Sequence, residues 1–197
     1  MTIQLIIYLL FFFLLFIPFY LFFRFLYLKS KNRLKIENWW KELGIFAFSV
    51  SILMIFYVTL FPTFLMVNQK LYMTFKKGNY HQNAIPFHTI KSLFYLLSHH
   101  IYLEYAWINL LGNIILFFPS AFLAILLFPS LKPFYILLFA LVFSTCIEII
   151  QIPMQRISDI DDIILNVFGA FIGVIFALFI QWLKRQKKTN QIEKQTS

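Results

Sequence analysis

The sequence predicts an all-α membrane protein, a polytopic bundle of about five transmembrane helices with one amphipathic helix at the outer membrane interface. Two observations support this fold class. Hydrophobic residues make up 61% of the 197 positions and charged residues only 13%, which exceeds the apolar content that a soluble domain of this length can bury. Five apolar stretches are also long enough for a membrane-crossing helix, which needs about 20 residues. These stretches are residues 3–28, 43–67, 107–128, 133–153 and 159–183.

The first stretch is interpreted as a retained helix and not as a cleaved signal peptide. It has no basic region at its start and no small-x-small cleavage pattern at its end. Arg24 lies near its end, where a long side chain can extend to the lipid headgroups. With the basic loop that follows, it forms a predicted extra N-terminal region over residues 1–42, ahead of a transmembrane domain over residues 43–183.

The lysine and arginine residues predict the orientation of the chain. With the amino terminus outside, eleven of the 17 basic residues fall on the cytoplasmic side and five on the outer side, as the positive-inside rule requires. The net charge of +9 is then explained by topology and by an anionic inner leaflet, and it implies no nucleic acid partner.

Residues 184–197 are rich in Lys, Gln and Thr, and we expect a disordered basic tail on the inner side.

Residues 68–106 form the one long connection, and the charge distribution places it outside. Apolar residues recur at helical spacing along its second half, with polar residues on the other side. This pattern predicts an amphipathic helix over residues 87–103 that lies in the outer interface. Asn83 and Pro86 favour a turn and a helix start just before it. Such a helix could cover the mouth of a polar site.

Polar side chains are concentrated at matching depths of the last three predicted helices. Asn109 and Asn113 share one helix face, as do Glu148 and Gln151 on the next helix. An ionised side chain in lipid costs roughly 2.5–3.5 kcal/mol unless it is paired or hydrated, so such a cluster indicates function. We therefore predict one outward-facing polar cavity. Its candidate ligand-binding residues are Asn83, Asn109, Asn113, Glu148, Gln151, Arg156, Asp159, Asp161, Asp162 and Asn166.

A purely structural role for these residues is the alternative. The polar side chains could form a network that fixes helix packing, and Asp159 could simply cap the start of the last helix. That explanation does not extend to Glu148, which lies about 7–8 Å below the end of its helix at 1.5 Å per residue. Gly169 and Gly173 form a small-x-x-x-small patch, which we interpret as a packing surface.

Several chemistries suit the cluster, and the residues do not choose among them. Glu148 is the candidate catalytic acid or base. The group could recognise peptide amides or sugars, or bind a phosphate through Arg156. Glu148, Asp159 and Asp162 could instead coordinate a hard divalent cation, although no metal or other cofactor is predicted.

Three ordered motifs resemble the VanZ-like membrane proteins. They are Asn83 to Ile90 (NAIPFHTI), Asn109 to Pro119 (NLLGNIILFFP), and the pattern E-x-x-Q-x4-R-x-x-D-x-D-D-x-x-x-N-x-x-G-x-x-x-G that begins at Glu148. The resemblance covers roughly residues 45 to 180. The founding member of that family is associated with resistance to the glycopeptide antibiotic teicoplanin. The resemblance implies a multi-pass protein of the bacterial plasma membrane.

The chain departs from the family pattern at two places. Pro119 is followed by Ser120 and Ala121, where family members often have Leu-Gly, so this helix could pack differently after its kink. His81 and Gln82 stand where the family often carries an arginine.

The sequence leaves three classes of function open. The first is a protein that binds or shields a lipid-linked cell-envelope precursor, or the drug itself, and so contributes to glycopeptide resistance. The second is an intramembrane enzyme that modifies an envelope lipid, although no Ser/His or Cys/His nucleophile arrangement demands it. The third is a small transporter, which five helices without an internal repeat do not favour.

Overall fold

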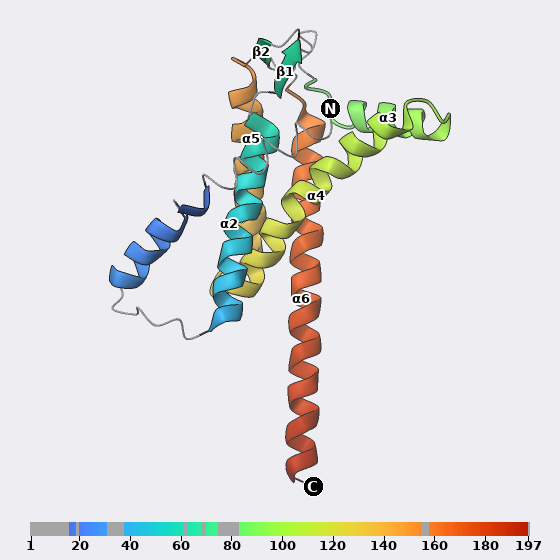
Figure 1. Cartoon of the computed structure of the whole chain (residues 1–197). Coiled ribbons are helices and arrows are strands. Elements are labelled where there is room, and N and C mark those ends of the chain that lie inside the picture. The colour runs from blue at the N-terminus through green and yellow to red at the C-terminus, as the bar shows by residue number, and fades with distance from the viewer. Residues whose placement is uncertain are drawn as a thin grey trace. The chain divides into compact units, whose positions relative to one another are not determined.

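The computed structural model describes residues 16–18, 20–30, 38–60, 63–67, 70–74, 83–154 and 158–196. Two compact units divide the chain, Met1–Phe46 and Ala47–Ser197. Figure 1 shows the elements along the chain. They are α2 (Trp39–Leu60), β1 (Thr63–Val67), β2 (Lys70–Thr74), α3 (His88–Ser98), α4 (Leu103–Leu127), α5 (Pro133–Gln151) and α6 (Ile160–Thr196).

Four helices within the described residues are long and apolar enough to cross a membrane, namely α2, α4, α5 and residues Ile160–Gln191 of α6. They confirm the predicted fold class, a helical membrane bundle. Residues 16–18 and 20–30 are helical, and the rest of the predicted first span, residues 3–28, lies outside the described part of the chain. The number of five spans therefore stays a prediction.

Helix α2 differs from the prediction of a helix over residues 43–67, because it begins at Trp39 and ends at Leu60. Residues Thr63–Val67 form strand β1, which pairs with β2 in an antiparallel hairpin, with Thr63 opposite Thr74. Pro62 in the sequence explains the early end. Proline lacks the backbone N–H that a helix needs and disfavours helical geometry in the residue before it.

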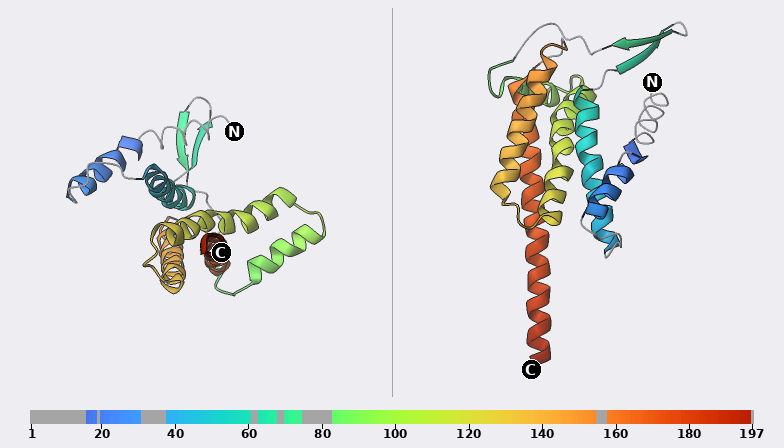
Figure 2. Two further views of the ribbon diagram at one scale, coloured as in Figure 1. Left: turned by 90° about the horizontal axis from the view of Figure 1, so that it is seen from below. Right: turned by 90° about the vertical axis from the view of Figure 1, so that its left-hand side faces the viewer.

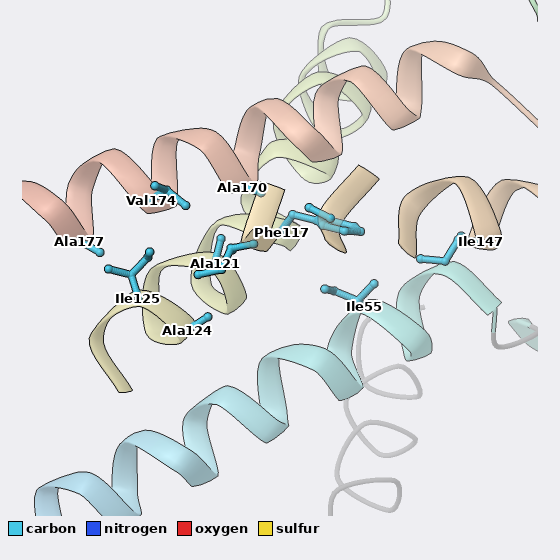
Figure 3. Packing of buried hydrophobic residues seen from close by; sticks show 11 residues of the cluster. Ile55, Phe117, Ala121, Ala124, Ile125, Ile147, Ala170, Val174 and Ala177 are labelled. Carbon is cyan, nitrogen blue, oxygen red and sulfur yellow. The ribbon is translucent and has the colours of Figure 1, made fainter. Parts of the chain in front are cut away.

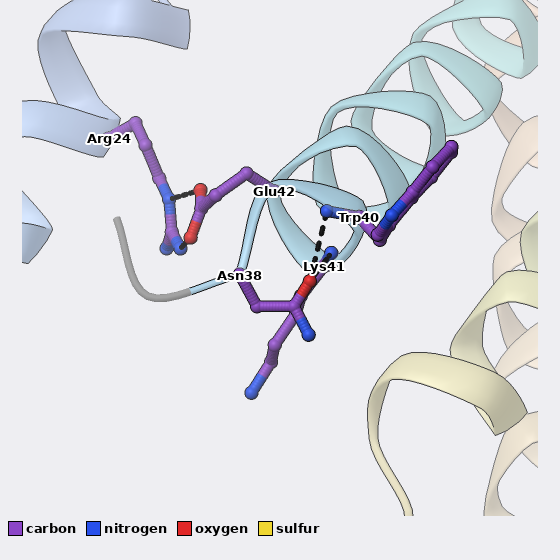
Figure 4. A network of polar contacts seen from close by, with 5 residues as sticks. All are labelled: Arg24, Asn38, Trp40, Lys41 and Glu42. Atoms are coloured by element: carbon purple, nitrogen blue, oxygen red, sulfur yellow. Dashed lines mark hydrogen bonds and ion pairs between the residues drawn. The ribbon is translucent and has the colours of Figure 1, made fainter. Parts of the chain in front are cut away.

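The Met1–Phe46 unit contains an ion pair that the sequence did not predict. Arg24 donates to both carboxylate oxygens of Glu42, at 2.8 and 2.5 Å, as Figure 4 shows. Asn38 accepts hydrogen bonds from the backbone N–H groups of Trp40 and Lys41 and so caps the start of α2. The charge of Arg24 is therefore balanced within the protein, where we had expected contact with lipid headgroups.

Helices α4, α5 and α6 lie side by side in the Ala47–Ser197 unit, and both views of Figure 2 show this arrangement. Their contact surfaces form a hydrophobic cluster in which small side chains alternate with larger ones (Figure 3). The labelled members are Ile55, Phe117, Ala121, Ala124, Ile125, Ile147, Ala170, Val174 and Ala177. Helix α4 continues through Pro119 to Leu127. Ala121, which follows Pro119 where the sequence departs from the family pattern, is packed in this cluster.

The packing role of the two glycines is confirmed. A Cβ atom on Gly169 would overlap the backbone of Ile114, and one on Gly173 would lie 2.5 Å from the backbone oxygen of Phe118. The backbones of α4 and α6 therefore touch at two successive turns, which only glycine permits.

Helix α6 continues through Thr196, whereas residues 184–197 were predicted to be a disordered tail. The right-hand view of Figure 2 shows this part of α6 extending past α4 and α5. Lys, Arg and Gln have good helix propensity, and they extend a helix whose nucleation cost has already been met. Low hydrophobicity alone therefore did not separate a disordered tail from a solvated helix.

The predicted amphipathic helix is present but shorter than the range 87–103. Helix α3 ends at Ser98, and α4 begins at Leu103 after a turn in which His100 and Tyr102 have positive φ. Leu93 of α3 is buried against Ala106 and Leu110 of α4. This contact holds α3 beside the first turns of α4.

Candidate functional site

A cavity of about 740 Å³ lies among α2, α4, α5 and α6. Six of the predicted site residues line it, and they come from three of these helices. They are Asn109 and Asn113 of α4, Glu148 and Gln151 of α5, and Asp162 and Asn166 of α6. The residues that helical spacing placed on shared faces thus line one wall of the same cavity.

The lining is polar at one end and apolar at the other. On α4 the cavity runs from Ile108 to Leu123, which is about 22 Å at 1.5 Å per residue. The amides of Asn109 and Asn113 lie in the first part of this stretch, and Leu116, Pro119 and Leu123 line the rest. The cavity therefore has the polarity of an amphiphilic molecule.

Two hydrogen bonds join the helices across the polar end. The Asn113 amide donates to the Asp162 carboxylate at 2.5 Å and connects α4 to α6. The Gln151 amide donates to the backbone oxygen of Thr59 at 2.9 Å and connects α5 to α2. These bonds fix the walls of the cavity relative to one another.

Glu148 lies where α5 meets the start of α6. Its side chain is 5% exposed, and its Oε2 accepts the backbone N–H of Asp159 at 2.8 Å. An unpaired N–H at a helix start carries partial positive charge, so a carboxylate is stabilised there. Glu148 thus both lines the cavity and holds the start of α6.

Asn166 lies deeper on α6 and is 2% exposed. Its Nδ2 donates to the hydroxyl of Ser144 at 2.9 Å. Its Oδ1 is buried and has no hydrogen-bond partner. A buried polar atom without a partner costs about 1–3 kcal/mol, and among the described side chains this oxygen is the one fully buried polar atom without a hydrogen-bond partner.

Asn83, Asp159 and Asp161 do not line the cavity. Asn83 pairs with Asp159 in a short parallel bridge, and its amide donates to the Asp159 carboxylate at 2.8 Å. The Thr89 hydroxyl donates to the other oxygen of Asp159 at 2.5 Å. The Asp159 carboxylate also accepts the N–H of Asp161. These contacts tie the segment before α3 to the start of α6.

Asp161 completes this junction. It is fully buried, and its two carboxylate oxygens accept the backbone N–H groups of Phe87, at 2.5 Å, and Ile90, at 3.0 Å. Both N–H groups belong to the beginning of α3, which has no cap from its own Ncap side chain. A carboxylate from α6 therefore caps α3.

Arg156 lies outside the described residues. Glu148, Asp159 and Asp162 do not form a metal site. Both oxygens of the Asp159 carboxylate accept hydrogen bonds, from Asn83 and from Thr89. Across the described part of the chain, no group of three or more His, Cys, Asp or Glu side chains is placed to hold a metal ion.

The site residues predicted from the sequence do not include Ser51, Thr59 or Ser144. Ser51 and Thr59 line the cavity, and the buried positions of α2 are Ser51, Ile55 and Thr59, four residues apart. This spacing gives α2 one buried face with a hydroxyl at each end. Ser144 lies four residues before Glu148 and thus on the same face of α5.

The fold and the cavity together define a multi-pass helical membrane protein with a partly buried polar site. A comparison with protein-family models matches residues 48–181 to the VanZ/LLP1 family, and the chain belongs to this family. The match includes all the residues that line the cavity except Ala47. Searches of curated proteins and of solved structures gave no match to the chain.

Proposed function

We propose that the cavity binds an amphiphilic molecule of the cell envelope, a lipid-linked precursor or a teicoplanin-type glycopeptide, and that binding limits the action of the drug. This proposal is supported by the polarity of the cavity lining. Polar side chains, those of Glu148, Asp162 and Asn113, lie at one end, and Leu116 and Leu123 lie at the other. A molecule with a polar head and an apolar chain matches this lining.

The size of the cavity favours binding over a packing role. Ligand sites usually measure about 300–1,000 Å³, and this cavity of about 740 Å³ lies within that range. A network that only fixed the helices would close over its polar groups, because each empty space in a helix bundle loses contact energy.

Glu148→Gln tests the proposal. Glutamine keeps the volume and an acceptor oxygen for the Asp159 N–H, but it removes the charge. We expect normal abundance in the membrane and at least about a tenfold loss of ligand retention, because a charge-assisted hydrogen bond contributes about 1.5–3 kcal/mol. Teicoplanin susceptibility of cells and retention of labelled teicoplanin or lipid extract by the purified protein provide the two measurements.

Glu104→Gln is the matched control, since Glu104 is exposed in the first turn of α4 and does not line the cavity. It should behave as the unmodified protein in both measurements. Undiminished drug protection and retention in the Glu148→Gln protein would contradict the proposal.

A second candidate function is an intramembrane enzyme acting on an envelope lipid. It is favoured by two carboxylates, Glu148 and Asp162, that line the same cavity, since paired carboxylates can serve as acid and base. Thin-layer analysis of membrane lipids from cells with and without the protein distinguishes the two functions. An enzyme changes the lipid pattern, and a binder leaves it unchanged.

The proposed site is on the outer side of a bacterial plasma membrane, with the amino terminus outside and the carboxyl terminus in the cytoplasm. The basic residues support this orientation. In a Cys146→Ala background, Lys77→Cys should react with an impermeant thiol reagent in intact cells, and Asn190→Cys should react only after lysis. The reverse labelling would contradict the outward-facing cavity.

A further inference from the structure

A second cavity, of about 350 Å³, lies between the α4–α5 turn and α6. Its walls include Ile125 at the end of α4, Leu131 in the turn, and Lys184 and Arg185 on α6. The right-hand view of Figure 2 shows this turn beside α6, at the level where α6 extends past the other helices. In the described part of the chain, this cavity shares no lining residue with the polar cavity.

The second cavity lies at the opposite membrane surface from the polar cavity. Asp162 lines the polar cavity and Lys184 lines the second one, and both residues belong to α6. They are about 33 Å apart along the helix at 1.5 Å per residue. This length is close to the thickness of the hydrocarbon core, which is roughly 30 Å. Lys184 and Arg185 are therefore at the level of the lipid headgroups of the other leaflet.

The lining of the second cavity is positively charged. Lys184 and Arg185 contribute to it, and no Asp or Glu occurs among the described residues that line it. The sequence has no acidic residue from 105 to 147 or from 163 to 192, which covers the turn and most of α6. The partial charges of the helix ends oppose each other, because α4 ends and α5 begins here. The two basic side chains therefore set the charge, and they attract an anion.

Hydrogen bonds hold the walls of the second cavity together. The Gln181 amide donates to the backbone oxygen of Ile125 at 3.2 Å and connects α6 to the end of α4. In the turn, the Leu131 N–H donates to the backbone oxygen of Phe128 at 2.9 Å. Two prolines of the same connection also line the cavity, and a proline ring restricts the backbone. The cavity is thus formed before any ligand enters.

The donors on α6 suit a phosphate group. Gln181, Lys184 and Arg185 are spaced by three and four residues, so they share one face of the helix. A guanidinium presents a planar fork that matches two phosphate oxygens, and an ammonium adds a point charge. Leu131 and Leu178 line the same cavity, and they would contact the methylene groups of a lipid. A free phosphate would leave these two side chains without a ligand contact.

We propose that the second cavity binds the phosphate headgroup of an anionic membrane lipid of the phosphatidylglycerol type. The phosphate would face Lys184 and Arg185, and the first methylene groups would contact Leu131 and Leu178. Basic pockets between transmembrane helices bind anionic headgroups at the cytoplasmic surface, which is the leaflet that the proposed orientation gives to this site. The inference goes beyond the proposed function and does not depend on it, because the two cavities are separate.

Native mass spectrometry of the delipidated full-length protein in a neutral detergent tests this site. The probes are phosphatidylglycerol and phosphatidylethanolamine with the same acyl chains. We expect phosphatidylglycerol to bind about tenfold more tightly, because the ammonium group of phosphatidylethanolamine is repelled by the two basic side chains. Inorganic phosphate should displace bound phosphatidylglycerol no more than ammonium acetate of equal ionic strength does, because it makes no apolar contact.

Lys184→Gln/Arg185→Gln is the decisive double variant. It should weaken phosphatidylglycerol binding about thirtyfold, or about fivefold for each charged donor. Lys91→Gln/Lys187→Gln is the matched control, since it removes the same charge from exposed side chains that do not line the cavity. The control should change the affinity by less than about twofold. Arg185→Lys keeps the charge but loses the planar fork, and it should weaken binding about threefold.

Three results would overturn the inference. The first is an unchanged phosphatidylglycerol affinity in the Lys184→Gln/Arg185→Gln protein. The second is an equal loss in this variant and in the Lys91→Gln/Lys187→Gln control, which would leave the basic residues with a role in topology alone. The third is displacement of the lipid by inorganic phosphate beyond the effect of ionic strength, which would assign the cavity to a soluble phosphate.

Discussion

The start of α6 and the residue before it carry two groups of polar side chains that differ in how completely they are hydrogen-bonded. Asp159 and Asp161 form the junction with α3, where all four carboxylate oxygens accept hydrogen bonds. Asp162 and Asn166 face the cavity, where Asn166 keeps an acceptor without a partner. Neighbouring acids on one helix thus have different roles, and the completeness of their hydrogen bonding distinguishes them.

The largest effect is expected from Asp161→Ala. This change leaves the N–H groups of Phe87 and Ile90 without their acceptor, and each such loss costs about 1–3 kcal/mol. The free energy of unfolding should fall by about 2–4 kcal/mol, measured by titration with a denaturing detergent. Amide hydrogen exchange in α3 should accelerate at the same time.

Asp161→Asn serves as its control, since asparagine keeps one acceptor oxygen and should lose less stability than alanine. If Asp161→Ala unfolded at the same detergent fraction as the unmodified protein, α3 would not depend on this carboxylate, and the distinction between the two groups would fail.

A smaller effect is expected from Thr89→Val, which keeps the shape of the side chain but removes its hydroxyl. The bond to Asp159 and the bond from Asn83 are lost, so unfolding should require about 1–2 kcal/mol less. Ligand retention should stay unchanged, because Thr89 does not line the cavity. Ser92→Ala, at an exposed position of α3, should be neutral within about 0.5 kcal/mol.

The smallest change in stability is expected from Asn166→Leu. The loss of the bond to Ser144 is offset by removal of the unpaired oxygen, so the free energy of unfolding should stay within about 1 kcal/mol of the unmodified protein. The same detergent titration measures it. A loss as large as that of Asp161→Ala would assign Asn166 to the structural group.

The sequence predicted the cavity wall better than the junction. Glu148 and Gln151, and likewise Asn109 and Asn113, are spaced so that a helix brings them to one face, and this requires only local geometry. Separating Asp161 from Asp162 requires the path of residues 83–90, which return to the start of α6. A contact between positions so distant in sequence cannot be derived from helical periodicity.

Hydroxyl groups were missed for another reason. Ser51 and Thr59 donate to backbone oxygens of their own helix, those of Phe48 and Ile55. Such local bonds make a hydroxyl compatible with an apolar helix, so its presence in a transmembrane segment gives little information about a site. Their spacing of eight residues becomes informative only once the neighbouring helices are placed.

The two backbone contacts of Gly169 with Ile114 and of Gly173 with Phe118 have a consequence for binding thermodynamics. Helices in contact through their backbones cannot slide past each other without losing that contact, so Asn113 and Asp162 keep their positions whether or not a ligand is present. A preformed wall requires little ordering when a ligand enters, which lowers the entropic cost of association. The shape of this wall is therefore set by the fold and not by a ligand.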